Sequence, residues 1–253
     1  TLAAALEGGD LSGRPVTLAS LWDRSSPAVI DCGYPCSADG NIWTVENAGG
    51  NAAHDLQSLE SATINSTNTV YARVIDAIGP EAVVETARRL GITSQYLKAY
   101  PSITLGAASV SPLEMAAAYS TLANYGSRVE PYLVERITDA TGAIIYEHAV
   151  RSNPALDRSV AAVVVTTLEK VVGQGTGTRA DIGRPQAGKT GTATDHTDVW
   201  FAGFVPQLTT TVWVGYPDRP LPMERFTIWN DVEDKPQDVQ RAFGGTVAAP
   251  VWR

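Results

Sequence analysis

Long apolar runs are absent from this 253-residue sequence, and so is any block of basic residues. Nothing approaches the ~18 consecutive apolar residues that a membrane span requires, and the opening TLAAAL is too short and lacks the basic flank of a signal peptide. The 27 acidic residues outnumber the 19 basic ones, which gives a formal net charge of -8 at pH 7. Such a surface repels phosphate backbones on average, so a nucleic-acid partner is not expected.

Cysteine is scarce as well. Only Cys32 and Cys36 occur, four positions apart in the Gly/Pro-containing stretch DCGYPCSADG. A metal site would need further ligands, and the three histidines, His54, His148 and His196, are scattered and form no recognisable ligand set. We therefore favour a local disulfide in an oxidising compartment, or two unpaired thiols, over half of a metal site.

The remaining composition, 44% hydrophobic and 18% charged residues, is typical of one globular domain. Apolar spacing and helix-end signals predict helices over 1–9, around 56–64, 70–78 and 82–90, from Ser111 to Gly126, and from Asp157 to Gly173. After the first helix, the Gly-, Pro-, Ser- and Asn-rich sequence up to about residue 50 is predicted to form loops.

Strands are predicted over 132–138 (YLVERIT) and 143–148 (AIIYEH). Two later runs rich in Val, Thr, Trp and Phe flank Pro206-Gln207 and predict an antiparallel hairpin. The order of these elements suggests a sheet packed with helices, in a mixed α/β or α+β arrangement.

GRPQAGKT, residues 183–190, satisfies the phosphate-binding pattern G-x-x-x-x-G-K-[ST] through Gly183, Gly188, Lys189 and Thr190. A phosphate loop needs a buried strand before it and a helix after it, because the loop amides and the helix amino end hold the phosphates together. Here the polar stretch GTGTRAD comes first and β-rich sequence follows. The loose dinucleotide pattern at 175–180 likewise follows a helix instead of a strand. Nucleotide binding is therefore disfavoured.

The same lysine opens Lys189-Thr190-Gly191 on a predicted strand, and Ser66-Thr67-Asn68 lies between two predicted helices. These are two of the three motifs of the penicillin-recognising serine enzymes, S-x-x-K, S-x-N and K-[ST]-G, in the right order. Each tripeptide alone is common, since serine and asparagine can merely cap a helix and threonines are ordinary strand formers. Their joint order and placement favour the functional interpretation.

Longer stretches carry a family resemblance. GTGTRA, AGKTGTA and DVWFAGFVPQ, between Gly175 and Gln207, resemble the transpeptidase domain of class A (bifunctional) penicillin-binding proteins, the enzymes that cross-link bacterial peptidoglycan. NSTNTVYARV and TLGAASVSPLEMAAAYSTLANYG are similar to the same family, so the resemblance covers most of the chain. It implies a single transpeptidase domain over residues 1–253, with an antiparallel central sheet packed with helices on both sides, as in serine β-lactamases. It implies no metal or cofactor, and a location outside the cytoplasmic membrane.

The resemblance also implies a substrate, a peptidoglycan stem peptide ending in D-Ala-D-Ala. This peptide would lie along the Lys189 strand as an added edge strand, with Gly191 permitting close backbone approach. Lys189 would supply a positive charge, and the hydroxyls of Thr190 and Thr192 would bind the terminal carboxylate. The carboxylate of a β-lactam antibiotic would take the same place.

Catalytic roles follow from the same resemblance. Ser66 would relay a proton to the departing amine with help from Lys189, and the Asn68 amide would orient the acyl portion of the substrate. The Thr192 backbone NH would form half of an oxyanion hole, whose other half is the nucleophile's own NH.

The nucleophile motif of the family is missing from these residues. None of the four lysines has a serine three positions before it; the pairs are Gln95 and Lys98, Thr167 and Lys170, Gln186 and Lys189, and Val232 and Lys235. In the family, S-x-x-K lies immediately before a helix that resembles TLAAALEGG, so the chain is expected to begin just after it. The absence of an initiator methionine and of the family's membrane anchor and glycosyltransferase region fits a fragment. Alone, this chain is expected to be inactive.

Three other functions stay open at this point. A D,D-carboxypeptidase or a β-lactamase would use water as the acceptor in the same chemistry. A catalytically inactive peptidoglycan-binding module would have lost its nucleophile in evolution.

A metal site could be suspected at Asp195, His196 and Asp198, where two carboxylates flank an imidazole. A solvated turn between strands explains these residues better, because partner ligands are not evident.

Overall fold

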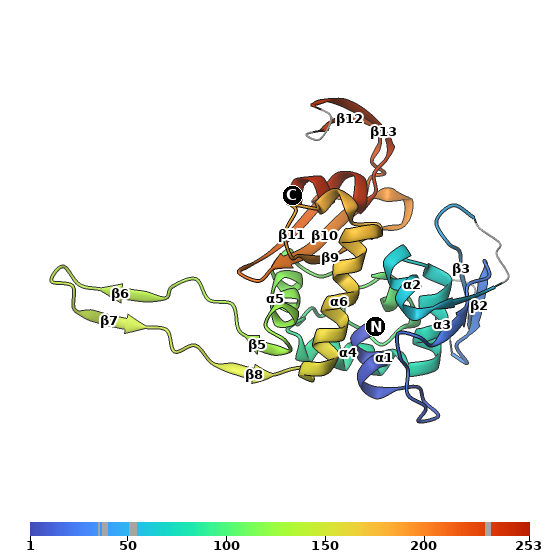
Figure 1. Ribbon diagram of the computed structural model, residues 1–253, viewed down its shortest axis with the longest axis horizontal. Helices are drawn as coiled ribbons and strands as arrows, with labels where there is room; N and C mark the ends of the chain where they lie inside the picture. The colour runs from blue at the N-terminus through green and yellow to red at the C-terminus, as the bar shows by residue number, and fades with distance from the viewer. Residues whose placement is uncertain (35, 37–39, 51–54, 231–233) are drawn as a thin grey trace.

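The chain folds into a body of helices and a three-stranded sheet, from which thin two-stranded ribbons extend (Figure 1). The computed structural model describes residues 1–34, 36, 40–50, 55–230 and 234–253. Within these ranges, no helix is both long and apolar enough to cross a membrane.

The helices follow the predicted order. They are α1 (Leu2–Gly8), α2 (Leu59–Asn65), α3 (Asn68–Ile78), α4 (Pro80–Arg89), α5 (Pro112–Ala123), α6 (Arg158–Gln174) and α7 (Ala249–Trp252), with short helical turns η1 (Pro101–Leu105), η2 (Thr178–Ala180), η3 (Thr194–His196) and η4 (Gly244–Ala248). The predicted start of α5 is confirmed: Ser111 Oγ accepts from the Glu114 amide and the Glu114 carboxylate accepts from the Ser111 amide.

The sheet has the strand order β11-β10-β9, with all pairs antiparallel, so β9 lies at its edge. Its strands are β9 (Ala187–Thr192), β10 (Asp198–Val205) and β11 (Leu208–Gly215), and the last two form the hairpin predicted around Pro206-Gln207. Helices cover both faces, as expected. Phe204 packs with α3, α5 and α6 on one face, and Phe201 packs with η4 and α7 on the other.

The main core joins α1, α3, α5 and α6 against the first of these faces. Its central side chains are Leu2, Val70, Val74, Ile75, Leu122, Val164, Leu168 and Val171. They recur every three or four positions along α3 and α6, so each helix turns one apolar stripe inward. The long α6 packs beside both α2, which ends just before Ser66, and β9, which contains Lys189 (Figure 1).

Several boundaries differ from the prediction. Leu56 lies in β4 (Leu56–Ser58), paired with β1 (Leu21–Asp23), because Ser58 caps α2 by accepting from the Ser61 amide, and the helix begins only at Leu59. The helix predicted to end at Gly173 continues to Gln174.

Ribbons complete the fold. β2 (Ala28–Asp31) pairs with β3 (Ile42–Val45), within the region predicted as loops, because each holds a short apolar run. The predicted strands 132–138 and 143–148 form the shorter β6 (Arg136–Thr138) and β7 (Ile144–Glu147), whose arm continues from β5 (Ser127–Val129) and β8 (Ser152–Pro154). β12 (Glu224–Asn230) pairs with β13 (Lys235–Arg241).

The two cysteines form a disulfide, with an S–S distance of 2.12 Å. This result selects the bonded form from the two forms that the sequence left open. Of the histidines considered as metal ligands, His54 lies outside the described residues.

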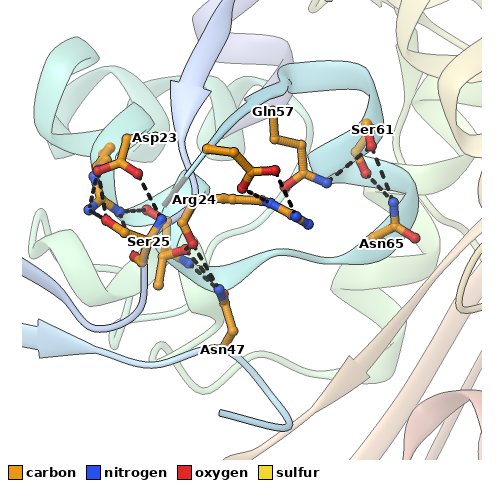
Figure 2. Close-up of polar contacts among 10 residues, drawn as sticks. Asp23, Arg24, Ser25, Asn47, Gln57, Ser61 and Asn65 are labelled. Carbon is orange, nitrogen blue, oxygen red and sulfur yellow. Dashed lines mark hydrogen bonds and ion pairs between the residues drawn. The ribbon is translucent and has the colours of Figure 1, made fainter. Parts of the chain in front are cut away.

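Asn47 fastens the first turn of α3 to the rest of the body (Figure 2). The N-cap residue of α3, Thr67, contributes no side-chain cap within the described part of the chain. Asn47 serves instead: its Oδ1 accepts from the Thr69 amide at 3.0 Å, and its Nδ2 donates to Thr69 Oγ1 at 3.0 Å and to the Arg24 carbonyl at 3.3 Å. A residue 22 positions away therefore caps this helix.

Further polar contacts tie both motif-flanking helices to β1 and β4 (Figure 2). From α3, Arg73 donates to Ser25 Oγ at 3.0 Å and to Asp23 Oδ2 at 3.1 Å. From β4, Gln57 Nε2 donates to Ser61 Oγ in α2 at 3.0 Å. These contacts fasten the helices on either side of the Ser66 turn to the segments around β1 and β4.

Replacing Asn47 by alanine is expected to lower the free energy of unfolding by about 2 kcal/mol, because a tertiary helix cap and two further hydrogen bonds are lost. Asn124 is the matched control, since its exposed side chain donates one bond, to the Ser127 carbonyl. Asn124→Ala should cost under about 1 kcal/mol. Urea unfolding of both variants measures the difference, and equal losses would contradict the capping role of Asn47.

Candidate active site

Ser66 stands at the turn between α2 and α3, as the sequence predicts. It is the C-cap residue of α2, with φ 56° and ψ 49°, and its amide donates to the carbonyls of Ala62 and Thr63. Asn68 is already the first residue of α3. A left-handed backbone is unfavourable for a residue with a Cβ, so the fold holds Ser66 in this conformation at a cost.

Lys189 lies within the edge strand β9 and extends to this turn. Its Nζ donates to Ser66 Oγ at 2.8 Å and to the Thr190 carbonyl at 3.1 Å. Two motifs 123 residues apart therefore meet through one hydrogen bond. The same placement removes the phosphate-loop alternative, because the lysine lies within a strand and the nearest following helical element is the three-residue turn η3.

Burial lowers the pKa of Lys189 from 10.5 to about 8. The residue as a whole is half-buried, and the partners of its ammonium are the hydroxyls of Ser66 and Thr190 and the Thr190 carbonyl, all of them neutral. The buried charge is thus left without an anionic partner among the groups that it contacts. Such a site favours an incoming anion.

Asn68 lies two residues after Ser66, at the start of α3. Its side-chain Nδ2 donates to the Glu46 carbonyl at 3.0 Å, one residue before the cap residue Asn47. Within the described residues, no direct hydrogen bond joins it to Ser66 or Lys189. The structure therefore brings Ser66 and Lys189 into contact and places Asn68 on the adjoining helical turn.

The remaining predicted residues line the second half of β9. Exposure rises along the strand, from buried Ala187 to exposed Thr192. Thr190 Oγ1 lies 2.7 Å from Thr176 Oγ1, and Thr192 Oγ1 accepts from the Gly244 amide at 3.1 Å.

Gly191, predicted to allow close approach of a substrate, also meets a packing need. It lies opposite Trp200 in β10, and a Cβ added at this glycine would lie 3.1 Å from the Trp200 Cβ. The neighbouring strand alone therefore disfavours a larger residue here.

Sequence reasoning assigned no role to Thr176 or Glu46. Thr176 belongs to GTGTRA, one of the stretches that resemble the family. That resemblance singles out the stretch, but it does not predict the contact of Thr176 with Thr190. Glu46 contributes a backbone carbonyl, for which sequence gives no signal.

Asp195, His196 and Asp198 form the turn between β9 and β10 and the start of β10. His196 Nδ1 lies 2.7 Å from the Ala242 carbonyl, and Asp198 Oδ1 accepts from the indole NH of Trp200 at 2.7 Å. In the described ranges, no group of three or more His, Cys, Asp and Glu residues is arranged to hold a metal ion.

Comparison with known proteins identifies the family. Residues 37–218 match the family model of the penicillin-binding protein transpeptidase domain. The match spans most of the chain and includes both sequence motifs, so the chain belongs to this family of transpeptidase domains.

Curated relatives point to the same group. Penicillin-binding protein 1A of Aquifex aeolicus (strain VF5) is 38% identical over 216 residues, which cover 85% of this chain and 28% of the relative. Penicillin-binding protein 1A of Neisseria meningitidis serogroup B (strain ATCC BAA-335 / MC58) is 34% identical over 221 residues, 85% of this chain and 26% of the relative. The chain thus spans little more than a quarter of these relatives.

Solved structures share the fold. PonA1 from Mycobacterium tuberculosis in complex with penicillin V has a TM-score of 0.75 and 26% identity, over 99% of this chain and 64% of that one. Penicillin-binding protein 1A from Haemophilus influenzae has a TM-score of 0.74 and 25% identity, over 85% of this chain and 36% of that one.

The strained backbone of Ser66 gives a stability test. Both Ser66→Gly and Ser66→Ala remove the hydroxyl, but only glycine tolerates a positive φ without steric cost. The glycine variant should therefore be more stable than the alanine variant, by about 1 kcal/mol in urea unfolding.

Ser120, inside α5, is the matched control with the opposite sign. There glycine should be less stable than alanine by about 1 kcal/mol, because glycine is a poor helix former. If the alanine variant is more stable than the glycine variant at both positions, Ser66 does not have the left-handed conformation.

Proposed function

We propose that this chain is part of a peptidoglycan D,D-transpeptidase, which cross-links stem peptides ending in D-Ala-D-Ala through a serine acyl-enzyme and binds β-lactams. The observation that carries the proposal is the hydrogen bond from Lys189 to Ser66 at the edge of the sheet. Membership of the transpeptidase-domain family supports it, as does the likeness to PonA1, whose structure contains penicillin V. On this proposal residues 1–253 form one transpeptidase domain that acts outside the cytoplasmic membrane, anchored there by the intact protein.

The substrate would add a strand along the edge of β9. Its terminal carboxylate would bind the Lys189 ammonium and the hydroxyl of Thr190, and Thr192 has an exposed side chain farther along the same strand. A carboxylate supplies the negative charge that the buried ammonium lacks. Main-chain pairing would give affinity, and the charged end would fix the register.

Ser66 would deliver a proton to the departing amine. A protonated lysine can only donate, so the Lys189 ammonium uses a lone pair of Ser66 Oγ. The hydroxyl proton of Ser66 would therefore be free to point toward the departing amine. This arrangement suits a proton relay, and Asn68 on the next turn would orient the acyl portion.

The acylated serine would come from outside these 253 residues. No S-x-x-K occurs in the sequence, and the Thr192 amide would supply only half of an oxyanion hole. The chain alone would then recognise the substrate carboxylate without forming an acyl-enzyme.

A fluorescent penicillin tests whether the acylated serine lies outside these residues. The isolated chain should remain unlabelled after denaturing electrophoresis, whereas a longer protein that adds the S-x-x-K segment should be labelled covalently. Stable label on Ser66, located by peptide mass spectrometry, would overturn the relay role. An unlabelled longer protein would contradict transpeptidation itself.

The lowered pKa of Lys189 predicts a pH dependence. Its ammonium loses the proton as pH rises through about 8, well below the ordinary value for lysine. Affinity for a peptide ending in D-Ala-D-Ala should therefore fall above pH 8, by up to about tenfold per pH unit, because the bound carboxylate favours the charged lysine.

NMR titration of the peptide between pH 7 and pH 9.5 measures this loss. The same peptide with a C-terminal carboxamide is the control, and its weaker affinity should stay constant over this range. A constant affinity for the acid would contradict the role of Lys189 as the carboxylate's partner.

A further inference from the structure

Thr176 extends the contact chain of the site by one residue. Its hydroxyl lies 2.7 Å from the hydroxyl of Thr190, which in turn lies 3.4 Å from Lys189 Nζ. Lys189 then reaches Ser66 at 2.8 Å. Four side chains, from the turn after α2, from β9 and from the turn after α6, thus form one continuous polar chain.

The direction of these hydrogen bonds is constrained by the charged groups. An ammonium can only donate and a carboxylate can only accept, whereas each hydroxyl has one proton to give. When a carboxylate binds, the single proton of Thr190 must point to it. Thr190 Oγ1 can then accept only, and its neighbour Thr176 must donate. As a donor to Thr190, Thr176 leaves the Thr190 proton to a bound anion, whereas as an acceptor it would take that proton.

The backbone of Thr176 is held between two parts of the fold. Its amide donates to the Ile64 carbonyl at 3.3 Å, two residues before Ser66. A Cβ added at Gly175 would lie 2.4 Å from the same carbonyl oxygen, and one added at Gly245 would lie 2.4 Å from the Thr176 carbonyl oxygen. Only glycine permits both approaches, so the turn that contains Gly175 and Thr176 packs tightly between the end of α2 and η4.

We propose that Thr176 is a positioning residue that orients the Thr190 hydroxyl toward the carboxylate of the substrate. The inference rests on the proposed function, since it assumes that Lys189 and Thr190 bind this carboxylate. It goes beyond that function by adding a residue outside the recognised motifs. Thr176 acts through Thr190 and needs no contact of its own with the substrate.

The test compares two peptides that differ only at their end, one terminating in D-Ala-D-Ala and the other in its carboxamide. The preference for the acid is the ratio of the two dissociation constants, measured by NMR titration at pH 7 with the full 253-residue chain. Thr176→Val, which keeps shape but removes the hydroxyl, should lower this ratio about tenfold, since hydrogen bonds to charged groups are the stronger ones. Thr176→Ser should restore it.

Two further variants separate orientation from general damage. A merely structural role would weaken both peptides equally and leave the ratio unchanged. Thr178→Val, at an exposed position two residues along, should have no effect. In a Thr190→Val background, adding Thr176→Val should change the ratio no further, because the hydroxyl to be oriented is already gone.

The outcomes distinguish the two proposals. If the wild-type chain binds acid and amide equally, the proposed carboxylate site is wrong, and this inference is wrong with it. If the wild type prefers the acid and Thr176→Val keeps the full preference, only the role of Thr176 is overturned. Failure of Thr176→Ser to restore the ratio would also overturn it.

Discussion

The hydrogen bond between the Lys189 ammonium and Ser66 Oγ is the contact on which the site depends. It joins an edge strand to the end of a helix, and it holds a lysine whose pKa is lowered by burial to about 8. A buried charge among neutral partners is unfavourable for folding. On the proposed function, the carboxylate of the substrate would supply the negative charge that these partners lack.

The rest of the fold holds the Lys189 ammonium and the Ser66 hydroxyl next to each other. On the helix side, Asn47 caps α3 from a distant segment, and the left-handed turn at Ser66 places its hydroxyl beyond the end of α2. On the sheet side, β9 packs against α6, and its half-buried middle carries the motif. Both halves of the site are therefore attached to the same core, and α6 touches both.

Sequence predicted what depends on local signals. The Ser111 capping box, the strand that holds Lys189 and the turn that holds Ser66 each follow from neighbouring residues, and all three are confirmed. The contacts of Asn47 and Thr176 could not be predicted, because an asparagine in a polar loop or a threonine between glycines is compatible with many partners. Leu56 was placed in a helix because its apolar spacing continues that of α2, but pairing with β1 prevailed over spacing.

Glycines allow backbone segments to contact one another directly around the site. A Cβ at Gly244 would lie 2.4 Å from the carbonyl oxygens of both Gly191 and Trp200, so η4 rests directly on the sheet. Gly175 brings the turn after α6 against the Ile64 carbonyl of α2, and Gly245 brings η4 against the Thr176 carbonyl of that turn. Backbone contacts of this kind leave little room for β9 to shift toward the covered face. Among the described residues β9 pairs along one edge only, with β10, so on the proposed function its other edge would receive the substrate strand.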